Sequence, residues 1–224
     1  MKIVPASDSS LLVVLGEAVS LDNHERVMSL FLGLQRLNEP RIRNLHPAYA
    51  SILIDFDPLQ MSHDEAVSLV ENVAAQGLSH YDRAVNIVTI PVCYDLEFGP
   101  DLRDVANHAK IPEREVIRLH SSVTYRVHFL GFTPGFAYLG GLPEALHAPR
   151  LASPRKHVPA GTVAIAGSQA GVYPVDSPGG WKLIGRTPVR IFDPGAMRPT
   201  LLEPGDLVRF SAIDRTLFDA TVQR

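Results

Sequence analysis

Three arginines in the second half of this 224-residue sequence directly follow a proline or a glycine: Arg150, Arg155 and Arg186. The planar guanidinium group of arginine offers a fixed fork of N–H donors that matches a carboxylate or a phosphate. These residues therefore indicate a site for an anionic group beside glycine-rich turns. The same arginines can instead hold loops in place by donating to backbone carbonyls, and the sequence leaves both interpretations open.

The segment from Ser177 to Trp181 reads Ser-Pro-Gly-Gly-Trp and is the second feature that could carry chemistry. Consecutive glycines, here Gly179 and Gly180, can expose backbone N–H groups to an anion or let a ligand approach the main chain. A tight turn between two strands is the simpler interpretation, and composition favours it. Trp181 can line an apolar pocket or fill the core, and the same alternatives hold for other aromatic residues nearby: Phe132, Phe136, Tyr138 and Tyr173.

His120 lies at the end of an expected helix. A histidine there can act as a general base or an orienting donor, or it can only complement the negative end of the helix dipole. Cys93 has no C-x-x-C partner, and we expect a buried, unreactive thiol. The sequence contains no G-x-x-x-x-G-K-[ST] phosphate loop, no G-x-G-x-x-G after a strand and no H-E-x-x-H zinc motif.

Composition is typical of a soluble globular protein, with 46% hydrophobic and 20% charged residues and a formal net charge of −3. This charge provides no long-range attraction for a polyanion, which argues against a nucleic-acid partner. The apolar run from Leu11 to Leu15 is too short for a signal-peptide core or a membrane span. We therefore expect no membrane association and a cytoplasmic location.

The elements that must position these residues fall into two parts, because prolines and glycines concentrate after Gly131. The first part predicts a β-α-β-β-α-β order, which is typical of a ferredoxin-like split βαβ unit. Asp22 and Ser62 are the expected N-caps of its two helices, and Gly77 the expected end of the second. Its four strands are expected at residues 11–15, 42–46, 51–56 and 85–92.

The second part begins with two short helices, expected at 102–109 and 113–120. Short strand-like runs then alternate with Pro-Gly turns, which indicates a β-barrel or sandwich. These runs lie at residues 123–130, 162–166, 181–184, 189–192 and 207–210. We predict an α+β chain with a small α/β domain at 1–90 and a β-barrel domain at 91–224 that carries the site.

Three long strings in the second part resemble the allophanate hydrolase subunit 1 family, which includes the 5-oxoprolinase B subunits (PxpB) and the sporulation-kinase inhibitor KipI. They are GFTPGFAYLGGL from Gly131, PRKHVPAGTVAIAG from Pro154, and YPVDSPGGWKLIGRTP from Tyr173. One departure is Thr162, where the family pattern has serine, and the hydroxyl is kept. The length and the two-part order of the whole chain also resemble the family.

The resemblance implies a cyclophilin-like β-barrel after the N-terminal α/β domain. It also implies one component of an ATP-dependent 5-oxoprolinase, inactive alone, that acts with the homologous C subunit and with the A subunit of the same complex. Together they would open 5-oxo-L-proline to L-glutamate, with the B and C subunits phosphorylating the lactam oxygen. ATP, with Mg²⁺, is the expected cofactor, and its site is expected to be shared with a partner chain.

On this resemblance, Arg155 and Arg186 are expected to bind anionic oxygens, and His120 to assist catalysis or orient the substrate. The expected substrate-binding residues are Arg150, Gln169, Tyr173, Ser177, Gly179, Gly180 and Trp181.

Two other functions stay open. The chain can be an inhibitor that docks on a histidine kinase through an apolar patch of the barrel. It can also be a relative that works on a urea-derived amide such as allophanate. Inhibition alone would not require three arginines beside glycine turns, so the sequence favours the enzyme component.

Overall fold

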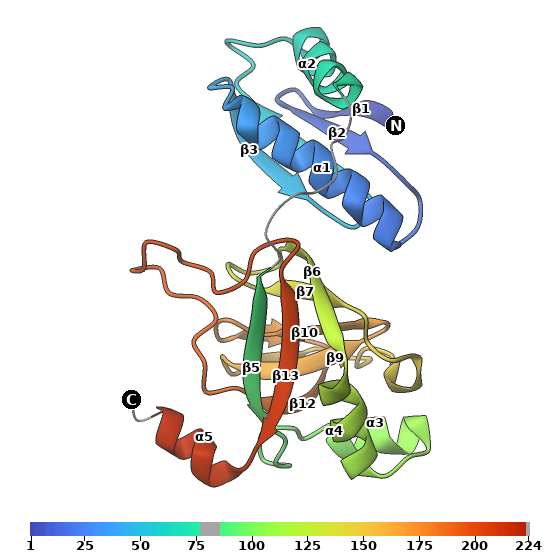
Figure 1. Cartoon of the computed structure of the whole chain (residues 1–224), viewed down its shortest axis with the longest axis vertical. Helices are drawn as coiled ribbons and strands as arrows, with labels where there is room; N and C mark the ends of the chain where they lie inside the picture. The colour runs from blue at the N-terminus through green and yellow to red at the C-terminus, as the bar shows by residue number, and fades with distance from the viewer. Residues whose placement is uncertain (77–85, 223–224) are drawn as a thin grey trace. The chain divides into compact units, whose positions relative to one another are not determined.

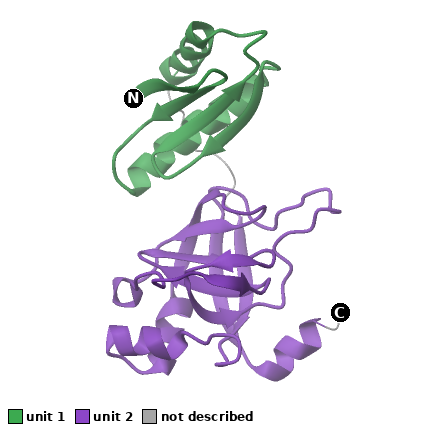
Figure 2. Cartoon of the chain, turned by 180° about the vertical axis from the view of Figure 1, so that it is seen from behind, with its two compact units in different colours: residues 1–84 green, residues 85–224 purple. Residues whose placement is uncertain are grey.

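The computed structural model describes residues 1–76 and 86–222. The chain divides into two compact units, Met1–Ala84 and Val85–Arg224 (Figure 2). None of the helices in the described segments is long and apolar enough to cross a membrane.

The first unit is an antiparallel sheet with two helices packed against it (Figure 1). In strands β2 and β4 alternate side chains are buried against the helices, as the two-residue period of a strand requires. The order across the sheet is β1-β2-β4-β3. The elements are β1 (Lys2–Ser7), β2 (Ser10–Val14), α1 (Leu21–Leu37), β3 (Ile42–Pro47), β4 (Ser51–Phe56) and α2 (His63–Ala75).

This unit differs from the predicted ferredoxin-like order at both ends. An extra strand, β1, pairs with β2 at the start. The predicted last strand, at 85–92, is β5 (Ile87–Cys93), which belongs to the second unit instead. Its side chains Ile90 and Val92 are buried in the core of that unit. Sequence pattern identifies a strand but not the sheet that it joins, because strand pairing is set by distant residues.

The helix ends show which of the predicted N-caps the structure confirms. Ser62 forms the predicted capping box with Glu65, so this N-cap is confirmed. The first helix begins earlier than predicted, because Ser20 is the N-cap and accepts a hydrogen bond from Asn23 N–H. Asp22 therefore lies in the first turn of α1. Gly77, the predicted end of the second helix, lies outside the described residues.

The second unit is a closed barrel of seven strands with the order β10-β7-β6-β13-β5-β12-β9. Strand β5 pairs in parallel with β13 (Leu207–Ile213), which pairs on its other side with β6. The remaining barrel strands are β6 (Thr124–Leu130), β7 (Ala137–Gly140), β9 (Thr162–Ala166), β10 (Gln169–Val172) and β12 (Lys182–Arg186). Outside the barrel, β8 (Arg155–Val158) pairs with β11 (Ser177–Gly179).

Helices cover part of the barrel. They are α3 (Leu102–Ala109), α4 (Glu113–Ser122), the short 3₁₀ helix η1 (Glu144–Leu146) and α5 (Arg215–Val222). The predicted helices at 102–109 and 113–120 are confirmed. The strand predicted at 189–192 is wrong, since only Phe192 pairs there, in an isolated bridge with Thr200. Strands β7, β8, β10 and β11 and helix α5 were not predicted.

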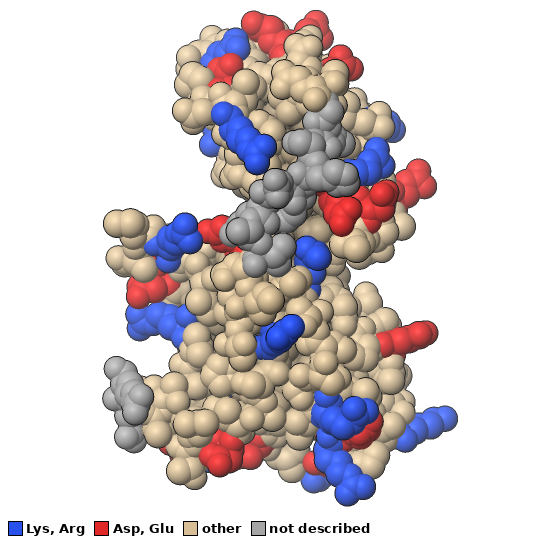
Figure 3. Space-filling model, in the orientation of Figure 1, with Lys and Arg blue, Asp and Glu red and all other residues tan. Residues whose placement is uncertain are grey.

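Charged side chains of both signs are interspersed over the face shown in Figure 3. Within the second unit this face carries no continuous patch of lysine and arginine among the described residues. The buried thiol expected of Cys93 is confirmed, since this residue has no solvent exposure.

Candidate functional site

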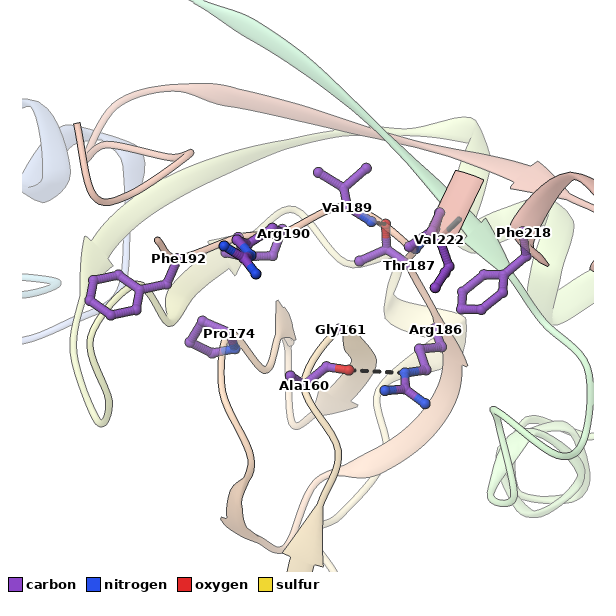
Figure 4. A pocket seen from close by; sticks show the side chains of 12 residues that line it. Ala160, Gly161, Pro174, Arg186, Thr187, Val189, Arg190, Phe192, Phe218 and Val222 are labelled. Carbon is purple, nitrogen blue, oxygen red and sulfur yellow. Dashed lines mark hydrogen bonds between the residues drawn. The ribbon is translucent and has the colours of Figure 1, made fainter. Parts of the chain in front are cut away.

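A pocket of about 320 Å³ opens in the second unit, where several strand ends meet (Figure 4). It contains Arg186, and we call it the Arg186 pocket. Its walls come from the turn after β8, the segment after β10, the segment after β12 and helix α5. The lining residues are Ala160, Gly161, Pro174, Arg186, Thr187, Pro188, Val189, Arg190, Ile191, Phe192, Phe218 and Val222.

The turn at Gly161 brings these strand ends together. Gly161 N–H donates to Tyr173 O at 2.7 Å, and Thr187 N–H donates to Gly161 O at 2.9 Å. Gly161 has a φ of +80°, and a Cβ at this position would lie 2.5 Å from Thr187 O. Only glycine fits both requirements, which explains the Pro-Ala-Gly string before β9.

Arg186, the last residue of β12, reaches across the pocket to this turn. Its Nε donates to Ala160 O at 2.9 Å, and its guanidinium carbon lies 5.9 Å from the centroid of the Phe98 ring. Among the described residues no carboxylate pairs with its two terminal nitrogens. The guanidinium group is thus oriented by a carbonyl and a ring but keeps donors for an anionic ligand.

The second arginine of the pocket, Arg190, already has an acidic partner. Arg190 is exposed and forms an ion pair with Asp193 at 3.1 Å. Aspartate and glutamate are absent from the described residues that line the pocket. Arg186 is therefore a cation with no acidic partner among the described residues that line the pocket.

Helix α5 forms one wall of the pocket through Phe218 and Val222. The ring of Phe218 packs 4.5 Å from that of Phe98, measured between centroids. Arg215, in the first turn of α5, donates to Glu97 at 2.7 Å and lies 4.5 Å from the Phe98 ring centroid. Phe98 therefore joins the wall helix to the side chain of Arg186.

Arg155 lies at the start of β8, and it does not line this pocket. Its Nη2 donates to Asp101 Oδ1 at 2.7 Å, and Asp101 Oδ2 accepts Leu183 N–H at 2.8 Å. The Arg155–Asp101 pair thus ties β8 to the start of α3 and to β12. Nη1 of Arg155 is buried and has no hydrogen-bond partner within residues 1–76 and 86–222. The sequence left two interpretations open for Arg155, and the observed contact fits the one in which the arginine holds chain segments in place. Its partner is a side-chain carboxylate and not a backbone carbonyl.

Arg150 lies 6.0 Å from the Trp181 ring centroid, in a cation–π arrangement. Trp181 is 6% exposed and packs among Phe136, Tyr138 and Tyr173 in what we call the aromatic cluster. Of the two roles considered for Trp181, the structure places it in the core.

The Ser-Pro-Gly-Gly-Trp segment is built around Tyr173. A Cβ on Gly179 would lie 2.2 Å from the Tyr173 hydroxyl. Gly180 O accepts Leu151 N–H at 2.7 Å. The glycines therefore admit a buried tyrosine and a neighbouring chain. Ser177 Oγ is buried and has no partner among the described residues.

His120 lies in the core of the second unit and outside the Arg186 pocket, and the catalytic role predicted for it stays a prediction. It has no solvent exposure, and its ring stacks on Phe210 with 4.6 Å between centroids. A hydrogen bond of 2.7 Å joins its Nδ1 to the Tyr94 hydroxyl. Burial lowers the pKa of His120 to about 3, so the ring is neutral near pH 7. The structure does not bring His120 together with Arg186.

Gln169 begins β10 and is half-buried, opposite Ala166 and Gly140, outside the Arg186 pocket. The residues that sequence reasoning missed are Asp101, Phe98 and the α5 residue Phe218. Asp101 precedes a helix, which signals an N-cap, yet its side chain makes no capping bond. Its partner Arg155 is 54 residues away, and no local pattern encodes such a contact.

In the described segments no group of three or more His, Cys, Asp or Glu residues could hold a metal ion. The residues of the Arg186 pocket therefore do not fit a magnesium site, because Mg²⁺ in proteins is held mainly through carboxylate oxygens.

Comparison with known proteins gives a consistent result. Residues 1–202 match the family described as "Carboxyltransferase domain, subdomain C and D". A protein named as the B subunit of 5-oxoprolinase from Bacillus subtilis is 39% identical over 223 residues, which are 95% of this chain and 93% of the relative. A protein of the same name from Haemophilus influenzae is 41% identical over 216 residues, covering 94% of this chain and 97% of the relative.

Solved structures agree with the sequence relatives. The crystal structure of a protein named TTHA0988 superposes with a TM-score of 0.81 at 38% identity, over 92% of this chain. This chain spans only 40% of that longer chain. A conserved uncharacterized protein from Pyrococcus horikoshii, PH0987, gives a TM-score of 0.58 at 43% identity, covering 97% of this chain and all of that one. The urea carboxylase of Kluyveromyces lactis shares the fold, with a TM-score of 0.81 at 20% identity over 99% of this chain and 22% of its own.

Proposed function

The chain belongs to the carboxyltransferase subdomain C and D family, and from this premise we propose that it is the B subunit of an ATP-dependent 5-oxoprolinase. It would act with the homologous C subunit and the A subunit of the complex to convert 5-oxo-L-proline to L-glutamate. The observation that supports a direct part in this reaction is the unpaired guanidinium group of Arg186, which faces a pocket in the second unit.

A lactam is a poor electrophile, and phosphorylation of its oxygen makes ring opening feasible. The lactam oxygen forms a bond to the γ-phosphorus of ATP, and the bond from this phosphorus to the ADP oxygen breaks. Water then adds to the ring carbon, and the C–N bond breaks with a proton passing to nitrogen. A second water releases inorganic phosphate from the resulting acyl phosphate. We assign the phosphorylation to the B and C subunits together, and completion of the hydrolysis to the A subunit.

In this reaction Arg186 would hold an anionic oxygen of the substrate inside a pocket that excludes part of the water. Its Nε bond to Ala160 O and its position beside Phe98 fix the direction of the two free nitrogens. A preorganised donor of this kind stabilises charge without reorganisation during the reaction. Arg155, held by Asp101, would keep the β8–β11 strands and the aromatic cluster in place beside the pocket turn. Arg150, Gln169, Tyr173, Ser177 and the two glycines would support the site's shape.

The chain would be inactive alone and part of a hetero-oligomer. Its sequence has no phosphate-binding loop, and the described residues offer no carboxylate cluster for Mg²⁺. ATP and its metal would therefore depend on a partner chain. We also propose that the barrel is cyclophilin-like and that the complex works in the cytoplasm, where ATP is available.

Reconstitution tests this function. The chain is purified with its partner subunits, and ADP and glutamate formed from 5-oxo-L-proline are measured. We expect Arg186→Gln to lower kcat/KM by about 10- to 100-fold, because a hydrogen bond to a charged group contributes about 1.5–3 kcal/mol. Arg118→Gln is the control, since Arg118 is exposed and already bound by Glu115. A well-formed complex that makes no glutamate would eliminate the proposal.

A further inference from the structure

The residues that line the Arg186 pocket restrict the class of ligand that it can bind. Among its described lining residues are two arginines and no acid, so it attracts an anion and lacks the oxygen ligands that Mg²⁺ prefers. A nucleotide in a phosphotransfer site carries this metal on its phosphates. The pocket therefore suits the other reactant of the proposed reaction better than the nucleotide.

The orientation of Arg186 leaves donors for one bidentate anion, a carboxylate or a single phosphate group. Because Nε is occupied by Ala160 O, the terminal nitrogens are left as one pair of donors. A pair of parallel N–H donors matches the two oxygens of a single carboxylate. Arg190, which pairs with Asp193 at 3.1 Å, adds no second free fork for a chain of phosphates.

The part of the pocket away from Arg186 is lined by apolar side chains and by the exposed Arg190. Figure 4 shows Arg186 beside Ala160, with Pro174 and Phe192 at the far end of the pocket. The volume of about 320 Å³ is near the lower limit of small-molecule sites, which span about 300–1,000 Å³. A small ring or short chain that carries one carboxylate fits the charge and the size of this pocket.

We infer that the Arg186 pocket binds the substrate through its carboxylate, as a small monocarboxylate with a compact body, while the magnesium nucleotide is held by a partner chain. This inference rests on the proposed function for the identity of the substrate, 5-oxo-L-proline. The carboxylate lies outside the lactam group, so Arg186 would position the substrate and leave the lactam oxygen free for phosphorylation.

Titration of the chain by NMR tests separately whether the pocket binds a carboxylate and whether it binds the magnesium nucleotide. The probes are 5-oxo-L-proline, 2-pyrrolidinone (the same ring without the carboxylate) and the magnesium complex of a non-hydrolysable ATP analogue. We expect 5-oxo-L-proline to bind, pyrrolidinone to bind at least 10-fold more weakly, and the nucleotide analogue not to compete. Arg186→Gln should weaken 5-oxo-L-proline binding at least 10-fold, and Arg118→Gln should leave it unchanged.

A second series of probes keeps this inference distinct from the proposed function. If 5-oxo-L-proline does not bind but propionate, butyrate or cyclopentanecarboxylate does, and does so through Arg186, the pocket assignment holds and the substrate assignment is wrong. If no monocarboxylate binds, or if the nucleotide analogue binds in an Arg186-dependent way, the inference is overturned.

Discussion

Arg155 and Arg186 follow a proline and a glycine in similar strings of sequence, yet the fold places them in opposite situations. Arg155 meets the carboxylate of Asp101, which also accepts a backbone N–H from β12. Arg186 meets only a backbone carbonyl and an aromatic ring, and its terminal nitrogens have no acidic partner in the described segments. The difference lies in one distant aspartate, which makes the first arginine structural and leaves the second free for a ligand.

The largest expected effect comes from removing that aspartate. Asp101→Ala leaves the partly buried Arg155 without its counter-charge and Leu183 N–H without its acceptor. Breaking such a pair costs about 3–5 kcal/mol when it is fully buried, and we expect about 3 kcal/mol here because the Arg155 side chain is 29% exposed. The free energy of unfolding, measured by urea denaturation, checks this value.

Two variants serve as controls for the Asp101 result. Arg103, on the same helix, pairs with Glu113, and the two side chains are 66% and 36% exposed, so Arg103→Ala should cost less than about 1 kcal/mol. Arg186→Gln should change the free energy of unfolding by less than about 1 kcal/mol while it impairs ligand binding. Equal destabilisation by Asp101→Ala and Arg186→Gln would remove the distinction between the two arginines.

The next-largest expected effect is the pH dependence of stability that comes from His120, which the sequence analysis assigned to the same site as Arg155 and Arg186. The unfolded chain protonates His120 near its ordinary pKa of 6.5, whereas burial holds the folded-state pKa at about 3. Its contribution to stability is therefore complete above pH 6.5 and is lost as the pH falls from 6.5 toward 3, by up to about 1.4 kcal/mol per pH unit.

The measurement is the free energy of unfolding between pH 7 and pH 4.5, for the wild type and for His120→Phe. The wild type should lose stability more steeply than the variant. His128, whose pKa is lowered to about 4, contributes in the same direction in both proteins and cancels in the comparison. Parallel curves would show that His120 is protonated at similar pH in the folded and unfolded chains, as an accessible histidine would be.

The smallest effect comes from giving Arg186 the acidic neighbour that it lacks. Val222, at the end of α5, lines the pocket and is 59% exposed, so Val222→Asp adds a carboxylate without disturbing the core. An exposed ion pair contributes about 0.2–1 kcal/mol, which predicts up to about 5-fold weaker binding of 5-oxo-L-proline. Val222→Asn, of equal shape and no charge, should bind as the wild type does. Equal weakening by both substitutions would point to shape and not charge.

Local signals in the sequence were sufficient for helices α2, α3 and α4 but not for the strand pairing of the barrel. The Ser62–Glu65 box and the helices at 102–109 and 113–120 depend on residues within a few positions of each other. Strand β5 has a clear apolar pattern, but it pairs with a strand more than one hundred residues later, so its sheet could not be predicted. Strands β7, β8, β10 and β11 have only three or four residues each, too few for an alternating pattern to stand out.

The candidate site also depends on contacts between residues that are distant in the sequence, which sequence patterns do not predict. Residue types drew attention to Arg155 and Arg186, since the chemistry of a guanidinium group is intrinsic. The sequence could not show that Asp101 occupies one of them, or that His120 is enclosed between Tyr94 and Phe210. The glycines at 179 and 180 were open to two interpretations, and the sequence could not show that the Tyr173 hydroxyl lies where a Cβ of residue 179 would be.

The position of β13 has a consequence for how the protein is made. This strand lies between β5 and β6, so the first barrel strand to leave the ribosome has to wait for the last one. The N-terminal sheet is complete once β4 has emerged and can form early, because domains fold as units during synthesis. A nascent chain that stops before residue 207 would carry a finished first unit and an unclosed barrel with exposed strand edges, which are prone to aggregate. Chaperone dependence should therefore be concentrated in the last stage of translation.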